Sequence, residues 1–137
     1  MTAWVSIEND AEFIRLSQAP DAVHWAMSLT GEITRVSDSV REVRGYSPQE
    51  AMAQGGDEIH PPQSLTESLR YFEELGRTLQ AGQPPAPFHG SLEYRCADGS
   101  TVWCDVAAGI VVTPTGDITE FRGVSVPVTP PESPAVA

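Results

Sequence analysis

The sequence predicts a single α+β domain, in which strands near both ends of the chain flank a mainly helical middle. Residues 22–27 alternate in the manner of a strand, residues 64–81 carry a long helical apolar stripe, and residues 92–126 read as three consecutive strands. A chain of 137 residues fits one core, which needs no disulfide or metal to fold.

The charge balance excludes several classes of function. The chain has 19 acidic against 8 basic residues and a net charge of -11, which argues against nucleic acid and anionic membranes as partners. All eight basic residues are Arg. Without lysine there is no Schiff-base lysine, no P-loop lysine and no phosphate-pairing lysine of a protein kinase. We therefore expect no kinase activity in this chain.

Cysteine and histidine spacing predicts no metal site and no disulfide. Cys96 and Cys104 lack a CxxC or HxxxH companion, and His24, His60 and His89 are scattered singly. No apolar run is long enough for a membrane span, and the N-terminus lacks the basic-then-apolar pattern of a signal peptide. These features predict a soluble, cytoplasmic domain.

Residues 6–17 form the first predicted helix, with Asn9 and Glu12 as its capping pair. Ile7, Ala11 and Ile14 recur at helical spacing. So short an amphipathic helix must bury its apolar face on the domain's own sheet or on a second copy of the chain.

Two short strands and two brief helices are predicted next. The strands cover residues 23–27 and 33–36, on either side of a turn at residues 29–32. Ser37 is the expected cap of a helix that ends at Gly45. Ser47 and Glu50, with Pro48 between them, form a complete capping box for the second helix.

The longest predicted helix covers residues 64–81. Ser64 and Glu67 form its expected capping box, and Gly82 ends it. Gly76 within it costs about 1 kcal/mol relative to alanine, which indicates either close packing or tolerated drift. Its apolar stripe consists of Leu65, Leu69, Phe72, Leu75 and Leu79.

The last third predicts a hairpin of residues 92–96 and 100–112, followed by a strand over residues 118–126. A three-residue loop with Gly99 in the left-handed conformation places Leu92 opposite Cys104 and Tyr94 opposite Val102. This register keeps Glu93, Arg95 and Trp103 on the outer face. The proline-rich tail from Pro127 predicts a disordered linker.

The order of elements and several phrases resemble a PAS domain, the sensory box of bacterial signalling proteins. The phrases are residues 19–23 (APDAV), 31–33 (GEI), 44–50 (RGYSPQE), 59–61 (IHP), 95–103 (RCADGSTVW) and 123–126 (GVSV). The resemblance covers about residues 10–129. We divide the chain into a cap helix (residues 1–18), a PAS domain (19–129) and a tail (130–137).

The resemblance implies a five-stranded antiparallel sheet with short helices and one long helix over its inner face, enclosing an apolar cavity. It implies a small organic ligand there, although the same stripe also suits ordinary core packing. We assign no catalytic residue. The expected ligand-binding residues are Trp25, Met27, Val43, Leu69, Phe72, Leu92, Tyr94, Val102 and Cys104.

Relatives of this kind pair as dimers and precede histidine kinases, diguanylate cyclases or response regulators, which suggests a two-component pathway. We expect a homodimer through Ile7, Ala11, Ile14 and Trp103, with a downstream effector domain. Two alternatives remain. One is an unliganded PAS scaffold whose task is pairing. The other is a small enzyme with His24 or Asp105 as base, for which the sequence offers no convincing pair of ionisable groups.

The cofactor is unknown, but two classes are disfavoured by comparison with relatives. Covalent flavin photosensors carry an Asn-Cys-Arg phrase before the long helix, and haem sensors carry a histidine on it; this sequence has neither. His60 is expected to cap or hydrogen-bond instead. Residues 55–59 (GGDEI) resemble a diguanylate cyclase signature, but their place between two helices indicates an acidic connector.

Overall fold

A computed structural model describes residues 4–129 of the chain. Five strands form one antiparallel sheet in the order β2-β1-β5-β4-β3, so the first and last strands of the chain lie side by side. The elements are a 3-10 turn η1 (Ile7–Asn9), α1 (Ala11–Ser17), β1 (Val23–Met27), β2 (Ile33–Val36), α2 (Val40–Arg44), α3 (Pro48–Met52), α4 (Gly56–Ile59), α5 (Pro62–Gln80), β3 (Phe88–Arg95), β4 (Thr101–Val112) and β5 (Ile118–Val128).

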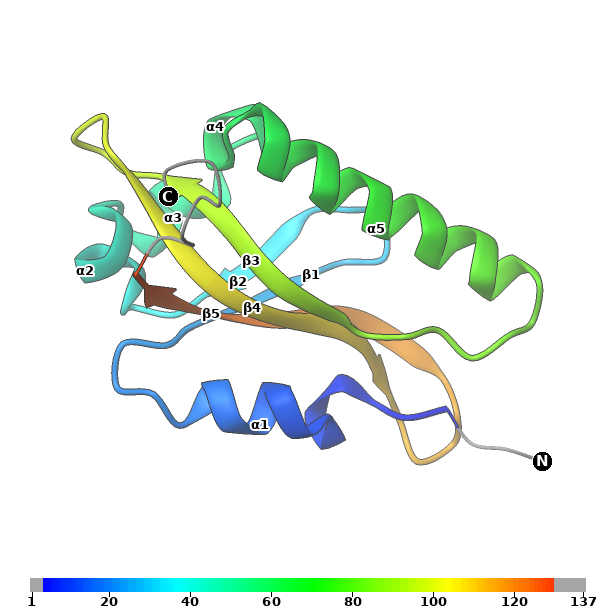
Figure 1. Cartoon of the computed structure of the whole chain (residues 1–137). Coiled ribbons are helices and arrows are strands. Elements are labelled where there is room, and N and C mark those ends of the chain that lie inside the picture. The colour runs from blue at the N-terminus through cyan, green and yellow to red at the C-terminus, as the bar shows by residue number, and fades with distance from the viewer. Residues whose placement is uncertain (1–3, 130–137) are drawn as a thin grey trace, which may run out of the picture.

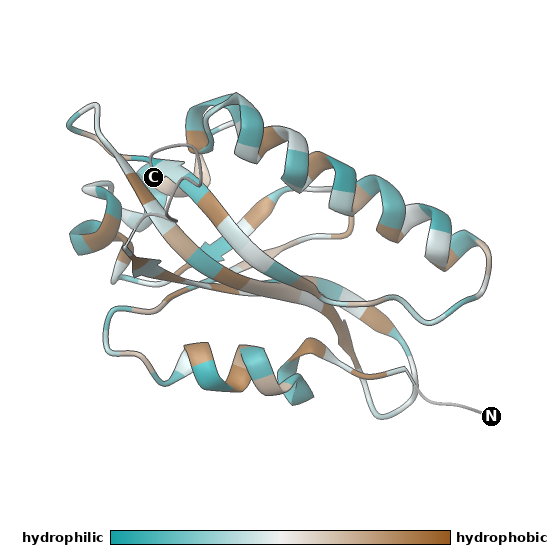
Figure 2. Ribbon diagram, in the orientation of Figure 1, coloured by the Kyte–Doolittle hydropathy of each residue, from teal (hydrophilic) through white to brown (hydrophobic). Residues whose placement is uncertain are grey.

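The sheet has helices on both faces (Figure 1). Helix α5 runs along the inner face, with α2, α3 and α4 at one end, while α1 lies against the outer face. Apolar residues are concentrated along the central strands, and apolar and polar positions alternate along α5 (Figure 2). The predicted α+β class and the five-stranded antiparallel sheet under one long helix are therefore confirmed.

The predicted hairpin register is confirmed. Leu92 pairs with Cys104, and Tyr94 pairs with Val102. Gly99 has φ 90°, which is the left-handed conformation that the bulged turn requires. This register sends Leu92, Tyr94 and Cys104 to the inner face, where they form one buried cluster.

Some of the predicted helix caps are present in the structure and others are not. Gly45 ends α2 with φ 79°, and Ser47 and Glu50 form both hydrogen bonds of the capping box of α3. Ser37 does not cap α2, because its hydroxyl accepts the backbone N–H of His24. Ser64 does not cap α5 either: the helix starts at Pro62, and the Ser64 hydroxyl accepts the N–H of Glu93. Both serines instead hold neighbouring segments together.

The predicted helix over residues 6–17 is interrupted. Asp10 has extended backbone angles, and its carboxylate accepts the N–H of Phe13, so Asp10 rather than Asn9 caps α1. The arm covers its own sheet: Ile7 is 3% exposed and faces Gly109, while Leu16 packs on Ala107 and Val124.

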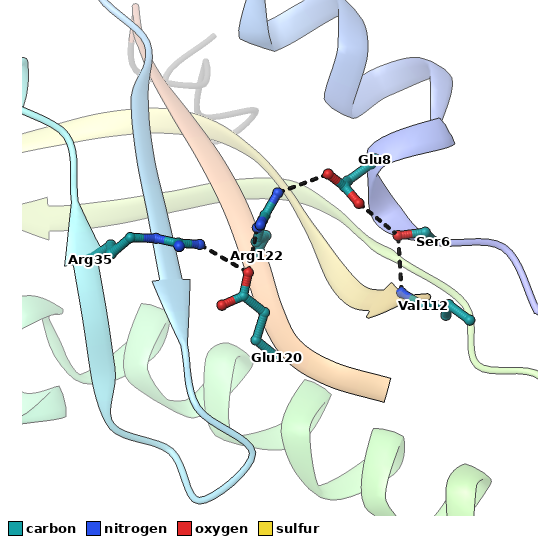
Figure 3. A network of polar contacts seen from close by, with 6 residues as sticks. All are labelled: Ser6, Glu8, Arg35, Val112, Glu120 and Arg122. Atoms are coloured by element: carbon teal, nitrogen blue, oxygen red, sulfur yellow. Dashed lines mark hydrogen bonds and ion pairs between the residues drawn. The ribbon is translucent and has the colours of Figure 1, made fainter. Parts of the chain in front are cut away.

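Polar contacts fasten this arm to the outer face (Figure 3). The Ser6 hydroxyl accepts the N–H of Val112, and Arg122 on β5 pairs with Glu8. Arg122 also pairs with Glu120, which in turn pairs with Arg35 on β2. The chain of contacts therefore ties η1, β5 and β2 to one another.

Several boundaries lie beyond the predicted ones. Strand β3 starts at Phe88 rather than residue 92, and β5 continues to Val128, with Pro127 opposite Cys104. Residues 56–59, predicted as a connector, form α4. Residues 1–3 of the predicted cap segment and the predicted tail at 130–137 lie outside the described residues.

Candidate functional site

A cavity of about 1060 Å³ lies between α5 and the inner face of the sheet. It is far larger than a packing defect and is of the size that holds small-molecule ligands in other proteins. Its walls are contributed by both halves of the chain: β1, β2, α2, α3 and α4 at one side, α5 above, and β3, β4 and β5 below. The cavity is predominantly apolar, with a small set of polar side chains.

One end of the cavity is apolar. Phe72 and Leu75 point from α5 toward Phe121 on β5, and the Phe72 and Phe121 rings meet edge to face with centroids 5.5 Å apart. Met27, Leu79 and Ile118 complete this end. Such a surface offers dispersion contacts and no hydrogen-bond partner, so it suits an aliphatic or aromatic ligand group.

The other end contains a buried hydroxyl pair. Tyr94 on β3 is 8% exposed and Ser125 on β5 is 3% exposed, and their oxygens lie 2.8 Å apart. The indole N–H of Trp25 also donates to the Ser125 hydroxyl, at 3.1 Å. Burial raises the pKa of Tyr94 well above its ordinary value, so this side chain remains a neutral phenol.

The position of Trp25 depends on a glycine. Trp25 on β1 pairs with Gly123 on β5, and a Cβ at position 123 would overlap the indole ring. Because Gly123 has no side chain, the indole lies across β5 and its N–H reaches Ser125. Two adjacent strands, β1 and β5, thus position this indole N–H.

Arg44 adds a positive charge to this end. It is 7% exposed, and its guanidinium carbon lies 5.1 Å from the ring centre of Tyr46 and 5.7 Å from that of Tyr94. Its Nε donates to the carbonyl of Arg95, and its Nη2 donates to the side-chain oxygen of Gln54. Burial lowers the pKa of Arg44, but arginine remains protonated in proteins.

His60 and Cys104 complete the polar end. The His60 Nδ1 donates to the carbonyl of Glu93 at 2.8 Å, and the His60 and Tyr94 rings are in tilted contact, with centroids 4.6 Å apart and an interplanar angle of 47°. Burial, with a smaller effect from Arg44, lowers the pKa of His60, so this imidazole is neutral near pH 7. Burial raises the pKa of the Cys104 thiol to about 12, which removes the thiolate that a covalent linkage would need.

The structure gathers most of the predicted ligand-binding residues around the cavity. Val102 packs beside it without lining it, and Leu69, which lines it, is 58% exposed. The other lining residues of the predicted set are Trp25, Met27, Val43, Phe72, Leu92, Tyr94 and Cys104.

The cavity is also lined by polar residues that were not predicted as ligand-binding. Among them are Arg44, Gln54, His60 and Ser125, together with Thr30, Glu32 and Ser68. A signal for Arg44 exists, because it follows the buried Val40 by four residues and therefore shares its helix face. Ser125 alternates with Phe121 and Gly123 along β5, which also indicates the inner face.

The residues predicted for a dimer interface divide into two groups. Ile7 is buried against its own sheet, whereas Ala11 is exposed, Ile14 is 44% exposed and Trp103 is half-buried. The latter three lie on the outer side of the molecule, away from the cavity. A dimer through this face would use Ala11, Ile14 and Trp103.

Residues 4–129 contain neither a metal-binding cluster nor a membrane-spanning helix. Within that range no three His, Cys, Asp or Glu side chains gather closely enough to hold a metal ion. In the same range no helix has the length and apolar character needed to cross a bilayer. Cys96 and Cys104 are both free thiols.

Comparison with known proteins identifies the fold. The family model described as "PAS fold" matches residues 33–125, which is more than half of the chain. A search of curated proteins found no significant match.

Solved structures agree with the family match. The PAS domain of a protein from Colwellia psychrerythraea is 17% identical, with a TM-score of 0.61 over 80% of this chain and 87% of that one. A light-oxygen-voltage domain, studied with a flavin analogue, is also 17% identical, with a TM-score of 0.60 over 88% of this chain and 87% of that one. At this identity the likeness concerns the fold alone. The family match, the order of the strands and the long helix over the inner face agree with one another, and the chain belongs to the PAS fold family.

Proposed function

We propose that this PAS domain is a sensory module that binds a small organic ligand in the cavity under α5. The module would pass the signal, through dimer packing, to an effector such as a histidine kinase. One observation carries the proposal: an apolar cavity of about 1060 Å³ with a few polar groups gathered at one end. That combination is typical of ligand sites, because the apolar walls supply affinity and the polar groups supply specificity.

The cavity also has a wall that can respond to a ligand. Helix α5 has only two buried residues, Ser64 and Leu75, along its 19 residues. An element with so few buried contacts can move at low cost, so a ligand that prefers one position of α5 would shift the population of the domain. An exposed face containing Ala11, Ile14 and Trp103 could then transmit the change to a second copy.

Native mass spectrometry of the purified domain tests ligand binding. We expect an additional mass of a few hundred daltons, either retained from expression or acquired in a ligand screen. Ala108→Phe places a ring in the cavity, because Ala108 lines it and is 5% exposed. This variant should lose the additional mass, whereas Ala53→Phe, at an exposed position after α3, should keep it.

A different result would favour the alternative of an unliganded scaffold. If the wild-type domain is a clean dimer that binds no member of a broad screen, the sensory proposal fails and pairing remains. If Ala108→Phe retains ligand as well as the wild type does, the ligand lies elsewhere and the cavity is not the site.

A further inference from the structure

The polar end of the cavity contains a buried positive charge with no negative partner. The Arg44 guanidinium donates to two neutral acceptors: the backbone carbonyl of Arg95 at 2.8 Å and the side-chain oxygen of Gln54 at 2.9 Å. No carboxylate of residues 4–129 lies within ion-pair distance of Arg44, and its Nη1 has no hydrogen-bond partner there. Arg44 also borders the cavity.

This arrangement differs from that of the other arginines of the chain. Five of them pair with carboxylates: Arg15, Arg35, Arg41, Arg77 and Arg122. Arg70 and Arg95 have no ion pair but are exposed, so Arg44 is the one buried arginine among residues 4–129. Arg44 is buried and relies on two aromatic faces and two neutral acceptors. Because burying an unpaired charge is costly, an uncompensated guanidinium at a cavity wall indicates that an anion completes it.

The hydroxyl pair beside Arg44 supplies a second, independent observation. The cluster contains three polar hydrogens, one each on Trp25, Tyr94 and Ser125, but only two hydrogen bonds. The indole donates to Ser125, and only one of the two hydroxyls can donate to the other. The remaining O–H proton, on Tyr94 or Ser125, has no acceptor among residues 4–129, although both side chains are more than nine-tenths buried. Both hydroxyl oxygens already have a hydrogen-bond partner, so the spare proton is a donor that is available to an acceptor bound in the cavity.

We infer that the cavity takes a monocarboxylic acid with an unbranched aliphatic body. Its carboxylate would accept hydrogen bonds from Arg44 and from the spare hydroxyl of the Tyr94–Ser125 pair. Its chain would extend between α5 and the sheet toward Phe121. Four residues of β5 separate Ser125 from Phe121, or about 13 Å at strand rise, which is roughly the length of an extended ten-carbon chain. The inference rests on the proposed function, since it specifies the ligand of the same cavity.

Calorimetric titration with three probes of equal length tests this inference. Decanoate, decanol and decylamine share one aliphatic chain and differ in the charge of the head group. Decanoate should bind the wild-type domain about 10- to 100-fold more tightly than decanol, the effect expected of hydrogen bonds to a charged group. Decylamine should bind more weakly than decanol, because it brings a second positive charge to Arg44.

Two variants locate the carboxylate. Arg44→Gln should weaken decanoate by about the same 10- to 100-fold and leave decanol unchanged. Tyr94→Phe keeps the ring that Arg44 and His60 contact but removes the hydroxyl, and it should weaken decanoate by about 3- to 10-fold. If Arg44→Gln fails to fold, Tyr94→Phe decides. Arg41→Gln, on the exposed side of the same helix, is the matched control and should match the wild type.

The outcomes separate this inference from the proposed function. If decanol binds as tightly as decanoate, or both variants keep wild-type affinity for decanoate, the carboxylate inference is wrong while the cavity remains a ligand site. If none of the three probes binds and the native domain carries no other ligand, both proposals are wrong.

Discussion

The close approach of Trp25 and Gly123 allows a sharp prediction. Gly123→Ala would place a Cβ over the indole atoms Cζ2 and Cε2, and 2.7 Å from Cη2. The obstacle is a rigid aromatic ring, so the whole side chain must turn away from β5. The turn also breaks the hydrogen bond from the Trp25 indole to Ser125.

The expected cost follows from these two losses. Overpacking typically costs about 1–3 kcal/mol, and a buried hydrogen bond contributes about 0.5–1.5 kcal/mol. We therefore expect Gly123→Ala to lower the free energy of unfolding by about 2–4 kcal/mol. In a domain of this size that corresponds to a fall in melting temperature of about 5–15 °C.

Urea unfolding monitored by far-UV circular dichroism measures the change. Gly109→Ala is a matched control on the opposite face of the sheet, because its Cβ would meet the flexible end of Ile7 at 3.2 Å. It should cost less than about 1 kcal/mol. In a Trp25→Ala background the cost of Gly123→Ala should disappear. An unchanged melting temperature for Gly123→Ala, or an equal cost with and without Trp25, would refute the assigned contact.

Three further predictions concern other parts of the chain. Gly99→Val forces a β-branched residue to φ 90° and should lower the free energy of unfolding in urea by about 2 kcal/mol, whereas Gly76→Ala, with open space around the new Cβ, should raise it by up to about 1 kcal/mol. The reverse order of stability would contradict the turn and helix assignments. The folded pKa of His60 lies below the unfolded value of 6.5, so the unfolded state binds more protons and the free energy of unfolding should fall as pH drops below about 6.5 toward the folded pKa. His60→Asn should lack this part of the pH dependence, and a stability-against-pH profile identical to that of the wild type would contradict the assigned burial of His60. Iodoacetamide should label the half-buried Cys96 in the native domain, but it should label Cys104, which is 1% exposed, only after unfolding. Equal labelling rates for the two thiols would show that the sheet is open at Cys104.

Local signals in the sequence predicted the parts of the fold that depend on neighbouring residues. The capping box at Ser47 and the glycine turns at Gly45 and Gly99 are decided within a few residues, and all three are confirmed. The pairing of Leu92 with Cys104 followed from keeping Glu93 off the inner face. The single five-stranded antiparallel sheet under one long helix came from the family resemblance rather than from any local pattern, and the order of its strands was not predicted.

The errors concern residues whose role is set by distant partners. Ser64 has the spacing of a helix cap, but its hydroxyl accepts from Glu93 on another strand. Arg44 would be solvated on most short helices, yet here its guanidinium reaches Arg95 and Gln54. The polar end of the cavity could not be predicted as a unit, because its members come from β1, α2, the C-cap of α4, β3, β4 and β5.

The ligand is proposed to bind in the space between α5 and the inner face of the sheet. This claim is best tested by measuring nuclear Overhauser contacts between bound decanoate and the domain. We predict contacts from the terminal methyl group of decanoate to Phe121 and Phe72, and contacts from the carbon next to the carboxylate to Tyr94. Contacts to Leu16 or Phe13, which belong to α1 and pack on the outer face of the sheet, would contradict this claim.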